Sequence, residues 1–219
     1  MNILLSALML IATATSQSPA RDALVVSPAW VAAHLNDRDL VLLHVGEKTT
    51  YDAGHLPGAR YVDFSRDLAV SDPDGLRLEM LPADVLRDRL AALGISDNSR
   101  VIVYQSDDFW TPSTRVMFTL DYAGLSQTAW MDGGLAAWTR EGQPTTTEAP
   151  PVARGTLSPL KLRPIVVDAA FVQQHANMAG FAIVDARAAS FYKGERAGSP
   201  GQQPGHIPGA LSVPFDSLT

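Results

Sequence analysis

The sequence predicts an α/β protein with a mainly parallel sheet covered by helices on both faces, present in two copies of which the second is incomplete. Three observations point to this fold class. Short apolar runs alternate with amphipathic segments, one six-residue motif occurs twice, and a stretch rich in proline and threonine divides the chain.

The composition is that of an ordinary globular protein, and it excludes several classes of site. The 219 residues give room for one large domain or two small ones, with 46% hydrophobic and 18% charged residues. The net charge is −6 and no basic run occurs, so a nucleic-acid partner is not expected. There is no cysteine, which excludes disulfides, thiolate metal sites and a cysteine nucleophile. The five histidines show no HxH or HxxxH spacing, so neither a metal site nor another cofactor is expected.

Residues 1–20 read as a secretory signal peptide. Ile3–Ala14 is nearly all apolar or small, yet too short to span a bilayer, and small residues at Ala14 and Ala20 suit cleavage. This predicts a periplasmic or secreted protein with no stable membrane anchor, since a lipid-modified cysteine is absent. The alternative is a buried N-terminal helix.

Buried strands and capped helices alternate through the first 144 residues. Continuous apolar runs predict strands buried on both faces, and apolar residues three or four positions apart predict helices. Ser27, which precedes Pro28, and Ser113 are expected to cap helices, while Gly94 and Gly124 are expected just past helix ends. The expected strands are Leu40–Val45, Arg60–Val62, Val101–Tyr104 and Thr128–Met131, and the expected helices run from Ser27 to about Leu35, Pro82–Leu93, Ser113 to about Ala123, and Gly133 through Trp138.

A linker is expected over Thr145–Pro164, because its three consecutive threonines, four prolines and Gly155 cannot build a core of their own. It separates a first domain, residues 23–144, from a shorter second part, residues 165–219. In that second part we expect a helix at about Ala169–Asn177 and strands at Ala182–Val184 and Leu211–Val213.

One motif occurs in both parts of the chain. Gly54-His-Leu-Pro-Gly-Ala59 recurs as Gly205-His-Ile-Pro-Gly-Ala210. Each copy lies between two predicted buried strands, and a tyrosine lies upstream of each, Tyr51 and Tyr192. A six-residue match in the same context twice indicates an internal duplication.

Together with two further motifs, the repeat resembles the signatures of rhodanese domains. Asp185-Ala-Arg187, Phe191-Tyr192-Lys-Gly-Glu195 and the second copy of the repeat are similar to the first signature of the family. Met131-Asp-Gly-Gly-Leu-Ala-Ala-Trp138 with Glu141-Gly142-Gln-Pro144 is similar to the signature near the end of the domain. The resemblance covers about Leu24 to Thr219 and implies a rhodanese-like fold in tandem.

This resemblance implies a sulfurtransferase of the thiosulfate/3-mercaptopyruvate type. In that family a cysteine in the second domain accepts sulfane sulfur from thiosulfate or mercaptopyruvate and becomes a persulfide. The sulfur then passes to cyanide or a thiol. The implied partners are therefore a small anionic sulfur donor and a thiol or cyanide acceptor, with backbone N–H groups at a helix start favouring the thiolate.

The chain departs from the family pattern in both copies. The active-site loop of the first domain follows Val101–Tyr104, and here it is degenerate, because glutamine cannot form a persulfide and two carboxylates would repel an anion. In the second copy, the sequence reaches Thr219 before the strand and loop that would hold the cysteine. We therefore expect the chain alone to be inactive. The degenerate loop consists of Gln105, Ser106, Asp107, Asp108, Phe109 and Trp110.

Asp185 and Arg187 are the candidate substrate-binding residues. They lie at the carboxyl end of a predicted parallel strand, where open α/β sheets bind ligands. Arg187 either orients an anion there or forms a structural ion pair with a carboxylate such as Asp185. The family often has an arginine just before the aromatic residue of this signature, where this chain has Ser190 and Phe191.

The other singled-out residues are expected to serve structure. His55 and His206 are expected to hold their loops through ring N–H bonds to nearby backbone, in preference to acting as catalytic bases. Arg115 is expected to brace the degenerate loop, with a place facing the first-domain pocket as the alternative. Trp138 and Trp130 are expected in the core or an interface. The acidic residues between Asp63 and Asp74 are expected to form a solvated loop, not a metal site.

Two functions of different classes remain open, and a third ranks last. The leading hypothesis is an N-terminal fragment, or a frameshifted product, of an exported tandem sulfurtransferase whose cysteine is missing from this chain. The alternative is a non-catalytic rhodanese-like binding or regulatory module that holds a small anion or a partner loop in the first-domain pocket. A phosphatase of the same fold ranks last, because it also requires the missing cysteine.

Overall fold

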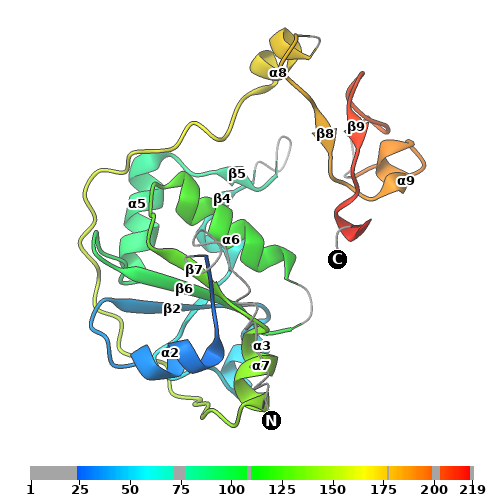
Figure 1. The fold of residues 1–219 in the computed structure, drawn as a ribbon. Coiled ribbons are helices and arrows are strands. Elements are labelled where there is room, and N and C mark those ends of the chain that lie inside the picture. The colour runs from blue at the N-terminus through cyan, green and yellow to red at the C-terminus, as the bar shows by residue number, and fades with distance from the viewer. Residues whose placement is uncertain (1–23, 72–76, 108–109, 177, 199–202, 218–219) are drawn as a thin grey trace, which may run out of the picture. The chain divides into compact units, whose positions relative to one another are not determined.

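The computed structural model divides the chain into two compact units, Met1–Arg163 and Pro164–Thr219, called unit 1 and unit 2 below (Figure 1). The predicted signal peptide, Asp108 and Phe109 lie outside the residues that the structure describes. Those described residues are 24–71, 77–107, 110–176, 178–198 and 203–217.

Unit 1 is built on a five-stranded sheet in which every pair of neighbouring strands is parallel. The strand order is β1-β7-β6-β2-β3, and the central pair β2–β6 runs in register from Leu40 opposite Arg100 to Val45 opposite Gln105. The predicted mainly parallel sheet is thereby confirmed. Its strands are β1 Val25–Val26, β2 Leu40–Val45, β3 Arg60–Val62, β6 Arg100–Gln105 and β7 Thr128–Met131.

Helices cover both faces of this sheet, because successive residues of a buried strand point to opposite sides. Leu43 and Val103 join the buried cluster under α5 (Ala83–Ala92) and α6 (Thr111–Tyr122). Leu42 and Ile102 join the cluster on the other face, which α2 (Pro28–His34) and α7 (Gly134–Arg140) cover. Three shorter features complete unit 1: helices α3 Lys48–Ala53 and α4 Phe64–Asp67, and an antiparallel pair of β4 Ala69–Val70 with β5 Glu79–Met80.

The helix ends follow the expected capping residues except at α6. Ser27 accepts a hydrogen bond from the Trp30 N–H at 3.1 Å, and Gly94 has a φ of 75° just beyond α5. Ser113 was expected to cap α6, and this is wrong, since α6 begins at Thr111 and Ser113 lies in its first turn. Pro112 explains the earlier start, because a proline needs no N–H partner in the first turn and its φ already suits a helix.

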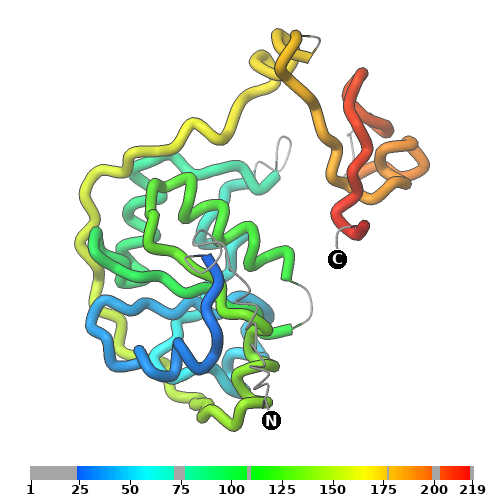
Figure 2. Tube along the Cα trace, in the orientation of Figure 1, coloured from blue at the N-terminus to red at the C-terminus, as the bar shows by residue number. Residues whose placement is uncertain are grey.

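The segment expected to be a linker lies along unit 1, and we call residues 145–163 the strap (Figure 2). It contains neither a helix nor a strand. The Gly155 N–H donates to the Ala91 carbonyl at 2.8 Å, and Asp97 accepts bonds from the N–H and the hydroxyl of Ser158 at 2.9 and 2.7 Å. Three strap leucines also pack against the core beneath α5 and α6: Leu157, Leu160 and Leu162.

Unit 2 is small and exposes most of its apolar residues. Its strands β8 (Val184–Asp185) and β9 (Leu211–Ser212) form a parallel pair, flanked by helices α8 (Ala169–His175) and α9 (Ala189–Tyr192). A 3-10 turn at Phe215–Ser217 follows. Of the described residues of unit 2, Ala210 alone is buried. Over both units, the helices within the described ranges are too short or too polar to cross a membrane.

Candidate functional site

The carboxyl ends of β2, β3 and β6 meet at one edge of the unit 1 sheet and enclose a pocket of about 250 Å³. Three carboxylates line this pocket, those of Glu47, Asp63 and Asp107. Asp63 caps α4 and accepts hydrogen bonds from the hydroxyl and the N–H of Ser65, which lower its pKa. The edge where the family pattern would hold an anion is therefore lined with negative charge in this unit.

Gln105 is turned away from that pocket. Its Oε1 accepts a hydrogen bond from Trp130 Nε1 at 2.6 Å. A Cβ at Gly134 would lie 2.7 Å from the Gln105 Cδ, so glycine is required for the side chain to pack there. The sequence alone does not indicate this contact, because it joins the ends of β6 and β7 with the start of α7.

The rest of the degenerate loop packs close to the backbone of unit 1. The Ser106 N–H donates to the Val45 carbonyl at 3.1 Å, and its Oγ lies where a Cβ of Gly46 would be. Asp107 lines the pocket, and Trp110 takes the N-cap position of α6. The described part of this loop is thus held close to the carboxyl end of β2.

Arg115 contacts the end of the β4–β5 connection. Its Nη2 donates to the Leu78 carbonyl at 2.8 Å and lies 3.0 Å from the Met80 Sδ. Leu78 has a φ of 58°, a left-handed conformation that a leucine rarely adopts. Burial lowers the pKa of the Arg115 guanidinium. Arg115 therefore holds the end of the β4–β5 connection in place.

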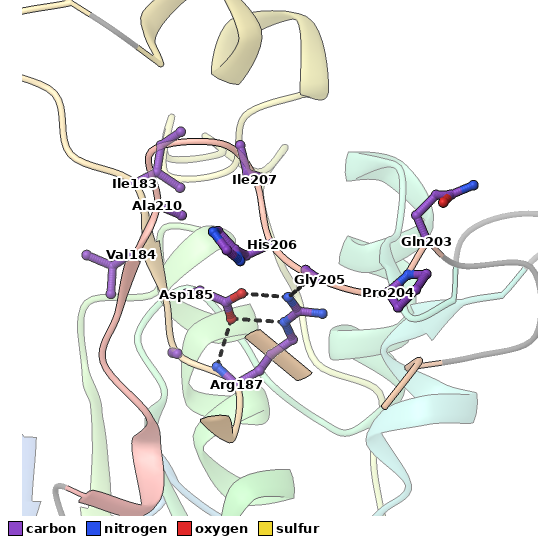
Figure 3. A pocket seen from close by; sticks show the side chains of 11 residues that line it. Ile183, Val184, Asp185, Arg187, Gln203, Pro204, Gly205, His206, Ile207 and Ala210 are labelled. Carbon is purple, nitrogen blue, oxygen red and sulfur yellow. Dashed lines mark hydrogen bonds and ion pairs between the residues drawn. The ribbon is translucent and has the colours of Figure 1, made fainter. Parts of the chain in front are cut away.

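Unit 2 carries a larger pocket, of about 590 Å³, at the carboxyl end of β8 (Figure 3). Asp185 and Arg187 both line it and face one another. Arg187 Nε donates to Asp185 Oδ1 at 2.9 Å and Nη2 to Oδ2 at 2.5 Å, while Nη2 also reaches the Gly205 carbonyl at 2.7 Å. The guanidinium holds the pKa of Asp185 at about 2. The ion pair considered from the sequence is thus present, and Arg187 still borders the pocket.

The two copies of the six-residue motif have the same local geometry. In unit 1, the Tyr51 hydroxyl donates to the Ala59 carbonyl at 2.9 Å, and His55 Nδ1 lies 2.7 Å from the Tyr51 carbonyl. In unit 2, Tyr192 and Ala210 make the same bond at 2.8 Å, and His206 Nδ1 lies 2.8 Å from the Tyr192 carbonyl. Tyrosine and histidine rings stack with centroids 3.7 Å apart in both copies. Both histidines therefore bind backbone through a ring nitrogen.

Trp138 is fully buried, and its Nε1 donates to the Pro144 carbonyl at 2.8 Å. The described residues contain no group of three or more histidine, aspartate and glutamate side chains placed to hold a metal ion.

Comparison with known proteins identifies the sequence family. The model of the rhodanese-like domain matches residues 27–141. A putative thiosulfate sulfurtransferase of Synechococcus elongatus is 31% identical over 210 residues, which are 95% of this chain and 62% of that protein. The sulfur carrier protein TtuD of Thermus thermophilus is 31% identical over 202 residues, which are 87% of this chain and 69% of that protein. The chain thus spans about two thirds of the length of these relatives.

Solved structures agree on the fold. The structure of SseA from Escherichia coli, described as a 3-mercaptopyruvate sulfotransferase with the rhodanese fold, superposes with a TM-score of 0.77. The two are 24% identical, and the match covers 89% of this chain and 76% of that one. At this identity the likeness describes the fold alone.

Proposed function

The chain belongs to the rhodanese family of sulfurtransferases, and from this premise we propose that it serves transfer of sulfane sulfur from thiosulfate or mercaptopyruvate to a thiol or cyanide. The proposal assigns the donor to the pocket of unit 2 and places the required cysteine outside these 219 residues. The observation that carries it is the position of Arg187, which borders an open pocket at the carboxyl end of a parallel strand.

The reaction needs a thiolate, which no residue of this chain supplies. A thiolate attacks the outer sulfur of thiosulfate, the sulfur–sulfur bond breaks, and sulfite leaves with the electron pair. The persulfide then gives its outer sulfur to cyanide as thiocyanate, which restores the thiolate. In this scheme, the residues of the chain bind and orient the anionic donor.

The charges of the two pockets support placing the donor in unit 2. The pocket of unit 1 is lined by three carboxylates, which would repel thiosulfate. The pocket of unit 2 has more than twice its volume and contains a guanidinium. The Asp185–Arg187 pair engages Nε and Nη2 of the arginine, so an anion would approach through Nη1.

Two further parts of the proposal concern origin and location. The matching bonds of Tyr51–His55 and Tyr192–His206 support the view that unit 2 derives from a second rhodanese copy.

The apolar leader at residues 1–20 supports export to the periplasm or the medium. Mature protein should then begin after Ala14 or Ala20, and an intact Met1 on cytosolic protein would argue against export.

A direct assay tests the missing cysteine. The purified chain should form no thiocyanate from thiosulfate and cyanide above the rate in buffer, and it should carry no persulfide label, because it has no thiol. Turnover well above buffer by the unmodified chain would refute the proposal.

A binding experiment tests the assigned pocket. Thiosulfate added to the full chain should shift the NMR signals of Arg187 and Gly205, and Arg187→Gln should weaken this binding about tenfold, since a charge-assisted contact contributes on the order of 1.5 kcal/mol. Arg154→Gln is the matched control, because Arg154 pairs with Asp88 on the surface of unit 1. Equal binding by both variants would rule out Arg187 as the anion-binding residue.

The non-catalytic binding module has one observation in its favour. Trp130 and Gly134 hold Gln105 in a defined position, as expected of a loop kept for structure. The small anion considered for the first-domain pocket is disfavoured by the three carboxylates, which leaves a partner loop with a basic side chain as the ligand of such a module.

A further inference from the structure

Helix α8 of unit 2 repeats α2 of unit 1 in detail. Asp168 accepts a hydrogen bond from the Phe171 N–H at 2.8 Å, as Ser27 does from Trp30. Phe171 stacks on His175 with centroids 4.0 Å apart, and Trp30 stacks on His34 at 3.8 Å. Both histidines also place Nδ1 2.7 Å from the carbonyl of the residue four positions earlier. With the repeated motif loop, the two units therefore share a helix and a loop whose residues correspond one to one.

In unit 1, the surface between this helix and this loop is covered. Val31 of α2 and Leu56 of the loop are both fully buried. They belong to one cluster with Trp138, whose helix α7 packs against α2. A tryptophan carried by a short helix thus closes the apolar surface that α2 and the loop form.

The chain that follows Trp138 then binds the histidine of the loop. Trp138 Nε1 bonds the Pro144 carbonyl, which directs the backbone past the motif. Thr146 and His55 exchange two backbone hydrogen bonds of 2.9 Å in an antiparallel bridge. The Glu148 carbonyl lies 3.2 Å from His55 Nε2. Residues 131–148 therefore act on α2 and on the loop as one continuous segment.

The corresponding surfaces of unit 2 are open. An apolar groove of about 440 Å³ runs between α8 and the loop, and we call it the α8 groove. Val172 takes the place of Val31 in it and Ile207 that of Leu56, yet Ile207 is 49% exposed. No described residue bonds Nε2 of His206. The groove is lined by Ala169, Val172, Gln173, Ala176, Ile207 and Pro208.

We propose that the α8 groove and His206 bind a partner segment built like residues 131–148, namely a short helix carrying a tryptophan followed by an extended strand. The aromatic ring enters the groove, which has no charged residue in its lining. The extended strand pairs with the backbone of His206 and places a carbonyl at Nε2, as Thr146 and Glu148 do at His55.

A second copy of the chain is a poorer occupant than a separate partner. Each copy has one such segment, and that segment is already held by its own unit 1. If one copy gave residues 131–148 to the α8 groove of another copy, the corresponding surface of its own unit 1 would be uncovered. The groove of unit 2 therefore calls for a segment that comes from elsewhere.

The test attaches the proposed binding segment covalently to the protein. A copy of residues 131–148 is appended to the full chain through a flexible Gly/Ser linker, which supplies an effective concentration near millimolar. Methyl NMR should show shifted Val172 and Ile207 signals, and amide exchange at Ile207 should slow at least tenfold. The matched control carries Trp138→Ala in the appended copy alone, and it should lose both effects.

A second variant guards against misfolding and misplacement. Ile207→Ser changes an exposed side chain, so it should leave the fold intact while abolishing the shift of the Val172 signals. Identical spectra with the two appended copies would overturn the proposal. Shifts at Val31 and Leu56 would also overturn it, because they would mean that the appended copy replaces the native segment in unit 1. A dimer of the unmodified chain that gives the same shifts at Val172 and Ile207 would overturn it as well. The readout requires no sulfur transfer and is therefore independent of the function proposed above.

Discussion

The imidazole of His44 is buried inside unit 1 among three tyrosines. Its Nδ1 lies 3.0 Å from the Tyr104 hydroxyl, and that hydroxyl accepts a bond from the Leu56 N–H at 3.2 Å. Desolvation, and then the nearby His55, lower the pKa of His44 from 6.5 to about 4. Since Tyr51 and Tyr61 also flank the ring, a proton on His44 would place a charge in an aromatic, apolar environment.

This burial predicts an acid-sensitive fold. The unfolded chain binds a proton at His44 below pH 6.5 and the folded chain only near pH 4, so stability is retained above pH 6.5 and falls between those values. The loss at the lower end is up to about 3 kcal/mol. Urea unfolding, followed by tryptophan fluorescence at several pH values, measures it, and His44→Phe should flatten the dependence. The same substitution at the half-buried His34 is the control and should leave the pH dependence of stability as it is in the unmodified chain. An unchanged pH dependence in His44→Phe would contradict the assignment of this acid sensitivity to His44.

Two serines allow a comparison of a working cap with a buried hydroxyl. Ser27 caps α2, whereas the Ser113 Oγ is buried with no hydrogen-bond partner among the described residues. Ser27→Ala should therefore lower the free energy of unfolding by about 1 kcal/mol. Ser113→Ala should leave it unchanged or raise it slightly, because it removes an unsatisfied polar group. A loss at Ser113 as large as that at Ser27 would show a partner for this hydroxyl.

Local chemistry explains which single residues the sequence could assign. Ser27 and Gly94 were predicted correctly, because caps depend on a few neighbouring positions. The partner of Gln105 could not be predicted, because Trp130 comes from a different strand and reaches it only after the sheet has formed. The Arg115 contact with Leu78 was missed for the same reason, as it joins α6 to the β4–β5 connection.

Among the elements of unit 1, the strap depends most directly on one small residue. A Cβ on Gly155 would lie 2.0 Å from the Ile95 carbonyl oxygen, so the strap reaches the end of α5 only because this residue is glycine. Gly155 has no positive φ there, so the requirement is one of space. The contact brings the Gly155 N–H to Ala91 and lets the strap leucines reach the core.

Gly155→Ala should therefore detach part of the strap. We expect a loss of about 1–3 kcal/mol in the stability of unit 1, as for other overpacked sites, and faster tryptic cleavage at Arg154 and Lys161. Gly54→Ala is the control, because its Cβ would meet Thr145 at an ordinary 3.5 Å. Equal cleavage rates in the two variants would mean that the strap does not depend on this contact.

The sequence predicts some elements of the fold correctly and leaves others out, depending on whether they carry a hydrophobic pattern. The limits of β2, β3 and β7 agree with the sequence, because continuous apolar runs end at charged or turn residues. Strands β1, β4 and β5 were missed, because two-residue strands carry no periodicity. The packing of the strap was also missed, because its proline- and threonine-rich composition is the same whether it is held or free.

At the scale of the whole molecule, the two units differ strongly in burial. Val101, Ile102, Val103 and Tyr104 are fully buried in the centre of the unit 1 sheet, whereas Leu211 of β9 is 59% exposed. All four tryptophans lie in unit 1 as well: Trp30, Trp110, Trp130 and Trp138. Fluorescence therefore reports on one unit, while hydrogen exchange reports on both.

This contrast predicts two levels of protection in one chain. Amides of β6 should exchange only through global unfolding of unit 1, and those of β9 should exchange orders of magnitude faster, because few buried contacts hold that pair of strands. Native-state hydrogen exchange with mass spectrometry measures both. Equal protection of β6 and β9 would contradict the prediction and would make unit 2 a folding unit as stable as unit 1.

The strap also decides where unit 1 can be separated from the rest for recombinant production. Ending the polypeptide at Pro144, where the domain pattern of the sequence stops, would remove the backbone partner of His55 and expose the core that Leu157, Leu160 and Leu162 cover. Such a product would be prone to aggregation. Ending it after Arg163 keeps the covering residues and the ion pair of Arg163 with Asp121. An excised domain should therefore end after Arg163, and it carries 19 residues more than its motifs alone would suggest.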